Sequence, residues 1–173
     1  MDEITGNDIN QYLTFYMADE IYGVSVANVK EVLSVSRITR VPRMPDYMSG
    51  VINLRGNVIP VIDLRLKFGL GPTPITEDTN IIVTEAVYLA DEEDSESLVV
   101  GIFTDAVQKV VTIEPDQIEP PPKMYSSIDS SFIIGMGKVD QMFIIILNLE
   151  KTLSQQELLS FALGRNREAA DNG

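Results

Sequence analysis

Carboxylates are the one plentiful kind of reactive side chain in this sequence. The 173 residues include 26 Asp and Glu, but no His and no Cys. The chain therefore lacks the commonest general base, the Ser-His-Asp and Cys-His nucleophile systems, and the thiolate and imidazole ligands of structural zinc sites. Two carboxylates at a fixed separation can still hydrolyse a glycosidic bond, so a carboxylate-based hydrolase stays an alternative. The composition favours a binding protein without catalytic site, cofactor or metal.

The acidic run at 91–97 is the candidate cation site of the sequence. It reads DEEDSES, and carboxylate oxygens are the ligands that Ca²⁺ and Mg²⁺ prefer. The run has neither the ligand register nor the glycine of a calcium-binding loop. We interpret it as the solvated tip of a β-hairpin, with an acidic ion-binding protein as a minor alternative.

Charge is distributed unevenly along the chain. The net charge of 13 − 26 = −13 argues against binding to nucleic acid or to an anionic membrane surface. Between Lys30 and Lys67, however, seven basic residues face only three acidic ones, which leaves 6 − 23 = −17 for the remainder. This segment is either a set of solvated arginines or a docking surface for an acidic protein. We favour docking, because Arg recognises carboxylates bidentately and is enriched at interfaces.

Short runs of β-branched residues, separated by Gly, Pro, Asn and Asp, predict a mostly β protein that positions these charges. The S-x-x-E spacing of Ser154 and Glu157 predicts a C-terminal helix over 153–164, followed by a flexible tail over 165–173. The acidic N-terminus is unlike a signal peptide, and Met142–Leu147 is too short to span a bilayer, so we expect a cytoplasmic protein. The expected strands are 12–17, 21–26, 50–54, 58–64, 80–89, 97–104, 132–136 and 142–149.

An internal repeat predicts two similar halves. With Gly23 placed on Gly101, the apolar triplet Val29, Val32 and Leu33 falls on Val107, Val110 and Val111. Their spacing is that of one helix face, so we expect two short helical segments buried between the halves. With Gly50 placed on Gly135, residues 58–64 fall on 143–149. We expect one half over about 20–80 and the other over about 81–150, with the N-terminal strand free to cross to the second.

The sharpest local motif is the predicted hairpin over 50–64, GVINLRGNVIPVIDL. Gly56 and Asn57 tolerate positive φ and predict a tight turn, which places Arg55 beside it. Arg55 is then either an ordinary hairpin residue or a binding residue, and the sequence alone does not separate the two.

Four stretches resemble the CheW family of bacterial chemotaxis coupling proteins, in the order in which that family has them. They are YGVSVANVKEVL, GVINLRGNVIPVIDLRLKFG, VVGIFTDAVQKVVTI and FIIGMGKVDQMFIIILNLEKTLS. The resemblance covers about residues 10–155. It implies a CheW-like domain over 10–152, made of two SH3-like five-stranded β-barrels related by a pseudo-twofold axis, with short helical segments and a C-terminal helix.

The family also implies a function without catalysis. Such a protein is an adaptor that couples chemoreceptors (methyl-accepting chemotaxis proteins) to the regulatory domain of the histidine kinase CheA. It is expected to be a cytoplasmic monomer that is recruited to membrane-associated receptor arrays without inserting into the membrane. A coupling protein of a pathway that controls pili or another output is the alternative within the family.

Site residues follow from the resemblance as well. The receptor tip, a helical hairpin, is expected in the groove between the halves. Val41 and Met44 in a proline-flanked loop are the candidate kinase contacts if they are exposed, and the alternative is that each folds back on its own barrel. Arg55 has a rival role, an internal salt bridge to Asp63 or another carboxylate. The candidate receptor contacts are Val29, Glu31, Gly50, Arg55 and Val107, in which the valines supply apolar contact and Gly50 permits close backbone approach.

Overall fold

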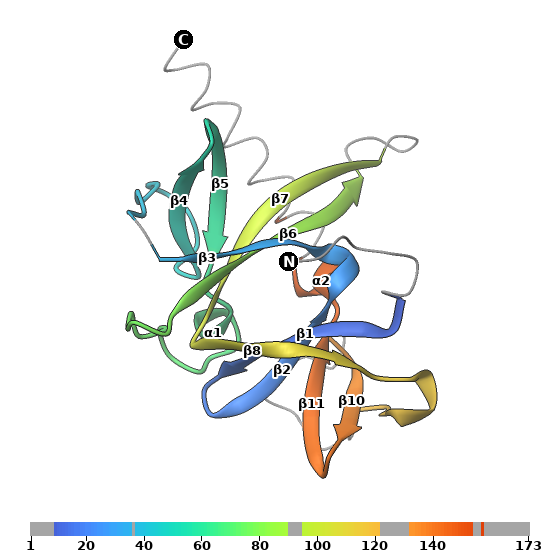
Figure 1. The fold of residues 1–173 in the computed structure, drawn as a ribbon. Helices are drawn as coiled ribbons and strands as arrows, with labels where there is room; N and C mark the ends of the chain where they lie inside the picture. The colour runs from blue at the N-terminus through green and yellow to red at the C-terminus, as the bar shows by residue number, and fades with distance from the viewer. Residues whose placement is uncertain (1–8, 36, 90–94, 122–131, 154–156, 158–173) are drawn as a thin grey trace.

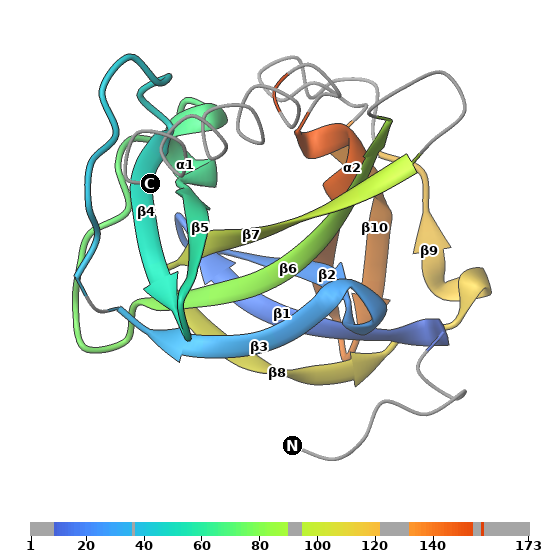
Figure 2. The same cartoon turned by 90° about the horizontal axis from the view of Figure 1, so that it is seen from above.

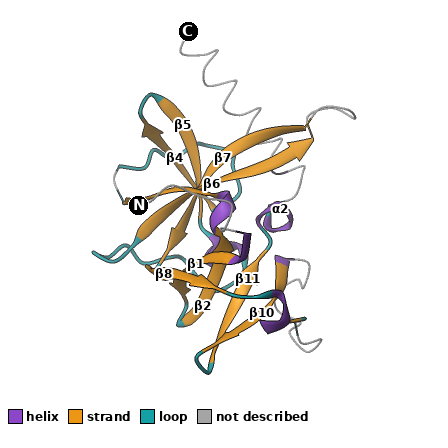
Figure 3. Cartoon of the chain, turned by 45° about the vertical axis from the view of Figure 1, so that its right-hand side comes forward, coloured by secondary structure: helices purple, strands orange, loops and turns teal. Residues whose placement is uncertain are grey.

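The computed structural model describes residues 9–35, 37–89, 95–121, 132–153 and 157, and strands dominate this part of the chain (Figures 1 and 3). Two α-helices of one turn each, α1 (Leu64–Lys67) and α2 (Leu149–Thr152), follow two of the hairpins. The strands are β1 (Gln11–Met17), β2 (Glu20–Ser25), β3 (Val29–Ser34), β4 (Met48–Leu54), β5 (Asn57–Ile62), β6 (Asn80–Leu89), β7 (Ser95–Thr104), β8 (Ala106–Thr112), β9 (Ile118–Glu119), β10 (Ile133–Val139) and β11 (Met142–Leu147).

The strands form two sheets. One has the order β8-β1-β2-β11-β10-β9 and the other β3-β6-β7-β5-β4 (Figure 2). The chain passes from the first sheet to the second through the 3-10 turn Val26–Asn28, and it returns at Asp105 between β7 and β8. The expected division near residue 80 is therefore wrong. β3 pairs with β6 and β6 with β7, so the second sheet holds 29–104, and the N-terminal hairpin joins the strands after 106.

Each predicted strand lies on an observed one, but the two predicted helical segments are wrong. Their residues form β3 and β8. Three apolar residues are too few to establish a helical period. Most of them are valines, and β-branched residues favour strands. The predicted C-terminal helix over 153–164 and the tail over 165–173 lie outside the described residues, apart from Leu153 and Glu157.

Strand registers reproduce both offsets of the internal repeat. The parallel pair β2·β11 aligns Gly23 with Ile146, and the parallel pair β5·β7 aligns Gly101 with Val61. Between the two pairs, Gly23 and Gly101 are 101 − 23 = 78 residues apart, and Val61 and Ile146 are 146 − 61 = 85 residues apart, as the repeat requires. Asp63 and Asn148, which are also 85 apart, each cap the helix that follows a hairpin. The internal repeat is therefore a repeat of pairing as well as of sequence.

The core has a shared part and a part under each sheet. The largest cluster combines Phe15 and Tyr22 of one sheet with Ile82 and Val100 of the other. Smaller clusters lie around Ile81, Val83 and Phe103, and around Ile113, Ile144 and Ile146.

The expected burial of the repeat valines is only partly correct. Val29 is buried, but Val32 is 37% exposed and Val110 is 47% exposed. Alternating strand residues face opposite sides, so one member of a helical triplet must face outward. A substitution such as Val32→Asp would therefore place its charge at the surface and not in the core.

Gly50 and Gly135, which are equivalent in the repeat, are both crowded by the backbone of a neighbouring segment. A Cβ at Gly50 would lie 2.4 Å from the Thr39 carbonyl oxygen, and one at Gly135 would lie 2.6 Å from the Glu119 carbonyl oxygen. We expect each Gly→Ala variant to lose about 1–3 kcal/mol of unfolding free energy by overpacking. Denaturant unfolding measures this, with Ser34→Ala at an exposed strand position as control. A variant as stable as the control would contradict the crowding at that glycine.

Candidate functional site

An ion pair joins β3 to the β4–β5 turn. Arg55 donates from Nη1 to Glu31 Oε2 and from Nη2 to Glu31 Oε1, each over 2.9 Å. The two-residue turn holds Arg55 in place, because Arg55 and Gly56 have φ of 52° and 87° and the Gly56 N–H donates to Asn53 Oδ1. The hydrogen bond from Arg55 lowers the pKa of Glu31 below its usual value. Arg55 thus has an internal partner, and that partner is Glu31. Asp63 is occupied by helix capping and by Thr73.

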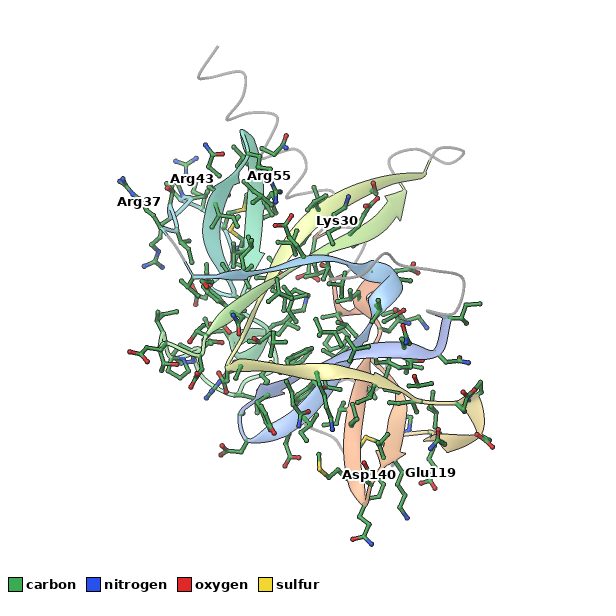
Figure 4. All side chains as sticks on the ribbon, in the orientation of Figure 1. Lys30, Arg37, Arg43, Arg55, Glu119 and Asp140 are labelled. Atoms are coloured by element: carbon green, nitrogen blue, oxygen red, sulfur yellow. The ribbon has the colours of Figure 1, made fainter. Side chains whose placement is uncertain are left out.

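A pocket of about 350 Å³ lies beside this ion pair. Its apolar lining comes from Leu54, Ile59, Val83 and Val99, of which Ile59 and Val83 are buried. Lys30, Glu31, Arg55 and Asn57 supply the polar lining, and Lys30 also pairs with Glu85 over 3.0 Å. Figure 4 shows Lys30 and Arg55 on the same part of the molecule as Arg37 and Arg43, with Glu119 and Asp140 at the opposite end.

The other candidate receptor contacts lie elsewhere. Val29 is 4% exposed and belongs to the shared core, and Val107 is half-buried against that core. Gly50 is buried and is approached closely by the backbone of this chain's own Thr39. The close approach expected at Gly50 is therefore internal. The structure brings Glu31 and Arg55 together and leaves Val29 and Gly50 without an open surface.

Val41 and Met44 are half-buried and pack against the shared core, which agrees with the alternative that each folds back on its own barrel. Exposed apolar side chains instead occur along the β10–β11 hairpin, with Ile134 near the start of β10 and Met142 and Phe143 beside the turn. Ile134, Met142 and Phe143 are 50%, 39% and 52% exposed, and we call these three residues the hairpin patch. The repeat carries a signal for two of these residues, because the positions 85 earlier than Ile134 and Met142 hold the polar Ser49 and Asn57, whereas Phe143 corresponds to the apolar Val58.

The groups at this site are of kinds that suit binding. An exposed bidentate ion pair next to an apolar pocket offers shape, charge and hydrogen bonds, and no acid or nucleophile among these residues faces a second reactive group. Within the described residues, no group of three or more acidic side chains is placed to hold a metal ion. The acidic run Asp91–Asp94 lies outside them. Fold and site together define a β-sheet protein-binding module.

Comparison with known proteins identifies which module this is. The family model of the CheW-like domain matches residues 11–157. The chemotaxis protein CheW of Klebsiella aerogenes is 31% identical over 91% of this chain and 90% of its own length. That of Bacillus subtilis is 37% identical over 83% of this chain and 86% of its own.

A solved structure agrees with these sequence matches. The crystal structure of the scaffolding protein TtCheW from Thermoanaerobacter tengcongensis superposes with a TM-score of 0.73 at 33% identity, covering 91% of this chain and 99% of that one. The chain belongs to the CheW family. It is a chemotaxis coupling adaptor.

Proposed function

We propose that this chain joins chemoreceptor tips to the regulatory domain of the kinase CheA by binding alone, without catalysis, cofactor or metal. Membership of the CheW family and the scaffolding role printed for TtCheW support this. We also propose that its two sheets are SH3-like barrels related by a pseudo-twofold axis, which the repeated pairings of Gly23 and Gly101 support. Measured turnover, or a rise in melting temperature on adding Ca²⁺, would favour the hydrolase or ion-binding alternatives.

We propose that the chain works as a cytoplasmic monomer recruited to receptor arrays. No helix within the described ranges is both long and apolar enough to cross a membrane. Whether the array controls flagella, pili or another output depends on its receptors, and the coupling role is the same in each case.

The receptor surface proposed here centres on Glu31 and Arg55. Arg55 is the exposed partner, with 69% of its side chain accessible against 29% for Glu31, so it can reach a second acceptor without leaving the turn. The pocket beside the ion pair, lined in part by Leu54 and Val99, adds apolar area. A helix docked on this surface would meet one charge with directional donors beside apolar area, which is how helices are held in grooves. Val29 and Val107 pack in the shared core, whereas the pocket beside this surface lies over the cluster that contains Ile59 and Val83.

Arg55→Ala tests the receptor surface. We expect affinity for a receptor-tip fragment to fall about tenfold, or ~1.4 kcal/mol, while the melting temperature changes by no more than a few degrees. Small stability effects are usual for exposed ion pairs. Calorimetric titration and a thermal melt measure the two quantities, with Arg37→Ala as a matched control. Large unfolding would make Arg55 structural, and unchanged affinity in a stable variant would place the receptor elsewhere.

For the kinase contact, the hairpin patch is a better candidate than Val41 and Met44. Its side chains are exposed, whereas Val41 and Met44 already pack against the core. Asp140 and Gln141 form the two-residue turn between β10 and β11 with φ of 50° and 67°, so the hairpin is short and well defined. A rigid apolar hairpin loses little entropy on docking.

Two double variants separate these candidates. We expect Met142→Gln with Phe143→Gln to reduce capture of the CheA regulatory domain about tenfold at an unchanged melting temperature. Val41→Asp with Met44→Asp should lower the melting temperature, because it places charges against the core. Pull-down at equal amounts of folded protein is the measurement. Full capture by the hairpin double variant would remove the patch from the kinase contact.

A further inference from the structure

The segment between β3 and β4 repeats a pattern of three residues. From Arg37 it reads RITRVPRMP, so an arginine, an apolar residue and a Thr or Pro follow one another three times. The apolar members, Ile38, Val41 and Met44, are half-buried and pack against the core clusters. The arginines are all exposed, and Figure 4 shows two of them pointing away from the rest of the molecule. We call these three residues the arginine row: Arg37, Arg40 and Arg43.

The other half contains an equivalent segment. Ile38 and Thr39 crowd Gly50, and Ile118 and Glu119 crowd Gly135 in the same way. The offset between these two pairs of residues is 118 − 38 = 80.

The equivalent segment has no arginine. With the offset of 80, Gln117 corresponds to Arg37 and Pro120 corresponds to Arg40. The same packing against a glycine is therefore built in the other half without positive charge. The fold alone does not explain why arginines stand at these positions.

Arg43 has a backbone conformation that few side chains adopt. It follows Pro42 in a turn and has a φ of 65°. Pro followed by a residue of positive φ is the arrangement of a type II turn, where the second position is usually Gly. A residue with a side chain lowers stability in this conformation, and such residues are concentrated at functional sites. A glycine at position 43 would suit the turn better than the arginine does.

The arginine row has no acidic partner within the described part of the chain. The ion pairs found there use other cations, namely Lys30, Arg55, Arg65 and Lys67. Asp46, the acidic residue nearest in sequence, is exposed and belongs to none of these pairs. Guanidinium groups bind carboxylates through two parallel hydrogen bonds, so these three side chains offer donors to another molecule.

We propose that the arginine row binds an extended acidic segment of a partner protein. Residues three apart in an extended chain lie up to about 11 Å from each other, whereas residues three or four apart on a helix lie within about 6 Å. The spacing of the arginines therefore matches carboxylates at every third position of an extended segment better than carboxylates on one helix face.

Charge favours a protein segment over a larger anion. The chain outside Lys30–Lys67 carries 6 − 23 = −17 and repels a membrane surface or a long nucleic acid, whereas a short segment meets only the arginine row. This binding is independent of the proposed receptor surface, where Arg55 already pairs with Glu31. Failure of the proposal would leave the coupling role of the chain unchanged.

Two synthetic peptides test the proposal with the full chain. One has Glu at every third position with Gly and Ser between, and the other has Gln in place of each Glu. Each exposed ion pair contributes modestly, so we expect several of them to make the Glu peptide bind about tenfold more tightly in fluorescence anisotropy at low salt. The preference should shrink as salt is added, because salt screens exposed charges. Equal binding of the two peptides would overturn the proposal.

Two double variants show which cations the peptide uses. Arg37→Gln with Arg40→Gln should remove most of the preference for the Glu peptide. Lys109→Gln with Lys138→Gln changes two exposed lysines of the other half and should leave the preference intact. Both double variants lower the net charge equally. An equal loss in both would therefore trace binding to net charge and overturn the arginine row as a site.

Arg43→Gly separates binding from folding, because its two effects should have opposite signs. Glycine readily adopts a φ of 65°, so the melting temperature should stay the same or rise. The affinity for the Glu peptide should fall about threefold, since one exposed ion pair is lost. Unchanged affinity in this variant would contradict a binding role for Arg43.

Competition identifies the class of anion. Vesicles of phosphatidylglycerol and phosphatidylcholine, and a single-stranded oligo-dT, are added to the complex of the full chain with the labelled Glu peptide. We expect neither to displace the peptide at an equal concentration of negative charge. Displacement by either one would assign the arginine row to a membrane or to a nucleic acid, and would overturn an acidic protein segment as its partner.

Discussion

Everything in this fold depends on two parallel strand pairings. β2 pairs with β11 and β5 with β7, and each pairing brings a glycine, Gly23 or Gly101, against a neighbouring strand. A Cβ would lie 3.1 Å from the Ile144 Cγ2 at the first and 2.8 Å from the Ile81 Cγ2 at the second. Strands joined in sequence can pair through short turns, whereas parallel partners need a long connection. The chain satisfies both pairings by crossing between the sheets twice, and these crossings create the core that the sheets share.

The crossings also place the proposed receptor surface. Because β3 follows the first crossing directly, it lies at one edge of the five-stranded sheet, with β4 at the other. The sheet curls so that Glu31 of β3 meets Arg55 of the β4–β5 turn, and the ion pair bridges the opening between the two edges beside an apolar pocket. The pair owes its position to backbone pairing and to the left-handed turn at Arg55. Its contribution is therefore geometric: it presents an oriented guanidinium on a rigid turn, which suits recognition better than it suits stability.

Strand positions and the repeat could be predicted from the sequence because period-two patterns and paired offsets are local signals. Sheet membership could not, since nothing local distinguishes a strand that pairs with its neighbour from one that crosses. Val32 is an example. A helix over these residues would bury Val32, whereas the observed strand turns it outward. Arg55 could be singled out beside its turn, but its partner Glu31 lies 24 residues away and enters only through the fold. Val41 and Met44 look exposed between prolines, and only the shared core shows where they pack.

Comparison of the halves explains how a repeated fold comes to have two different ends. The two offsets of the repeat make Lys109 the equivalent of Glu31 and Asp140 the equivalent of Arg55. Both charges of the ion pair are therefore reversed in the other half. The β-bulges in β3 and β8 also lie at equivalent positions, since the unpaired residues are Lys30 in one and Gln108 in the other. Yet among the described residues no ion pair joins Lys109 to Asp140. One half closes its opening with a salt bridge and the other presents an apolar hairpin with Asp140 in its turn. A symmetric pair of ends would bind two similar partners equally well. The reversal gives each end its own charge and polarity. Under the proposed function, such a difference is what would let an adaptor built from one repeated unit tell two partners apart.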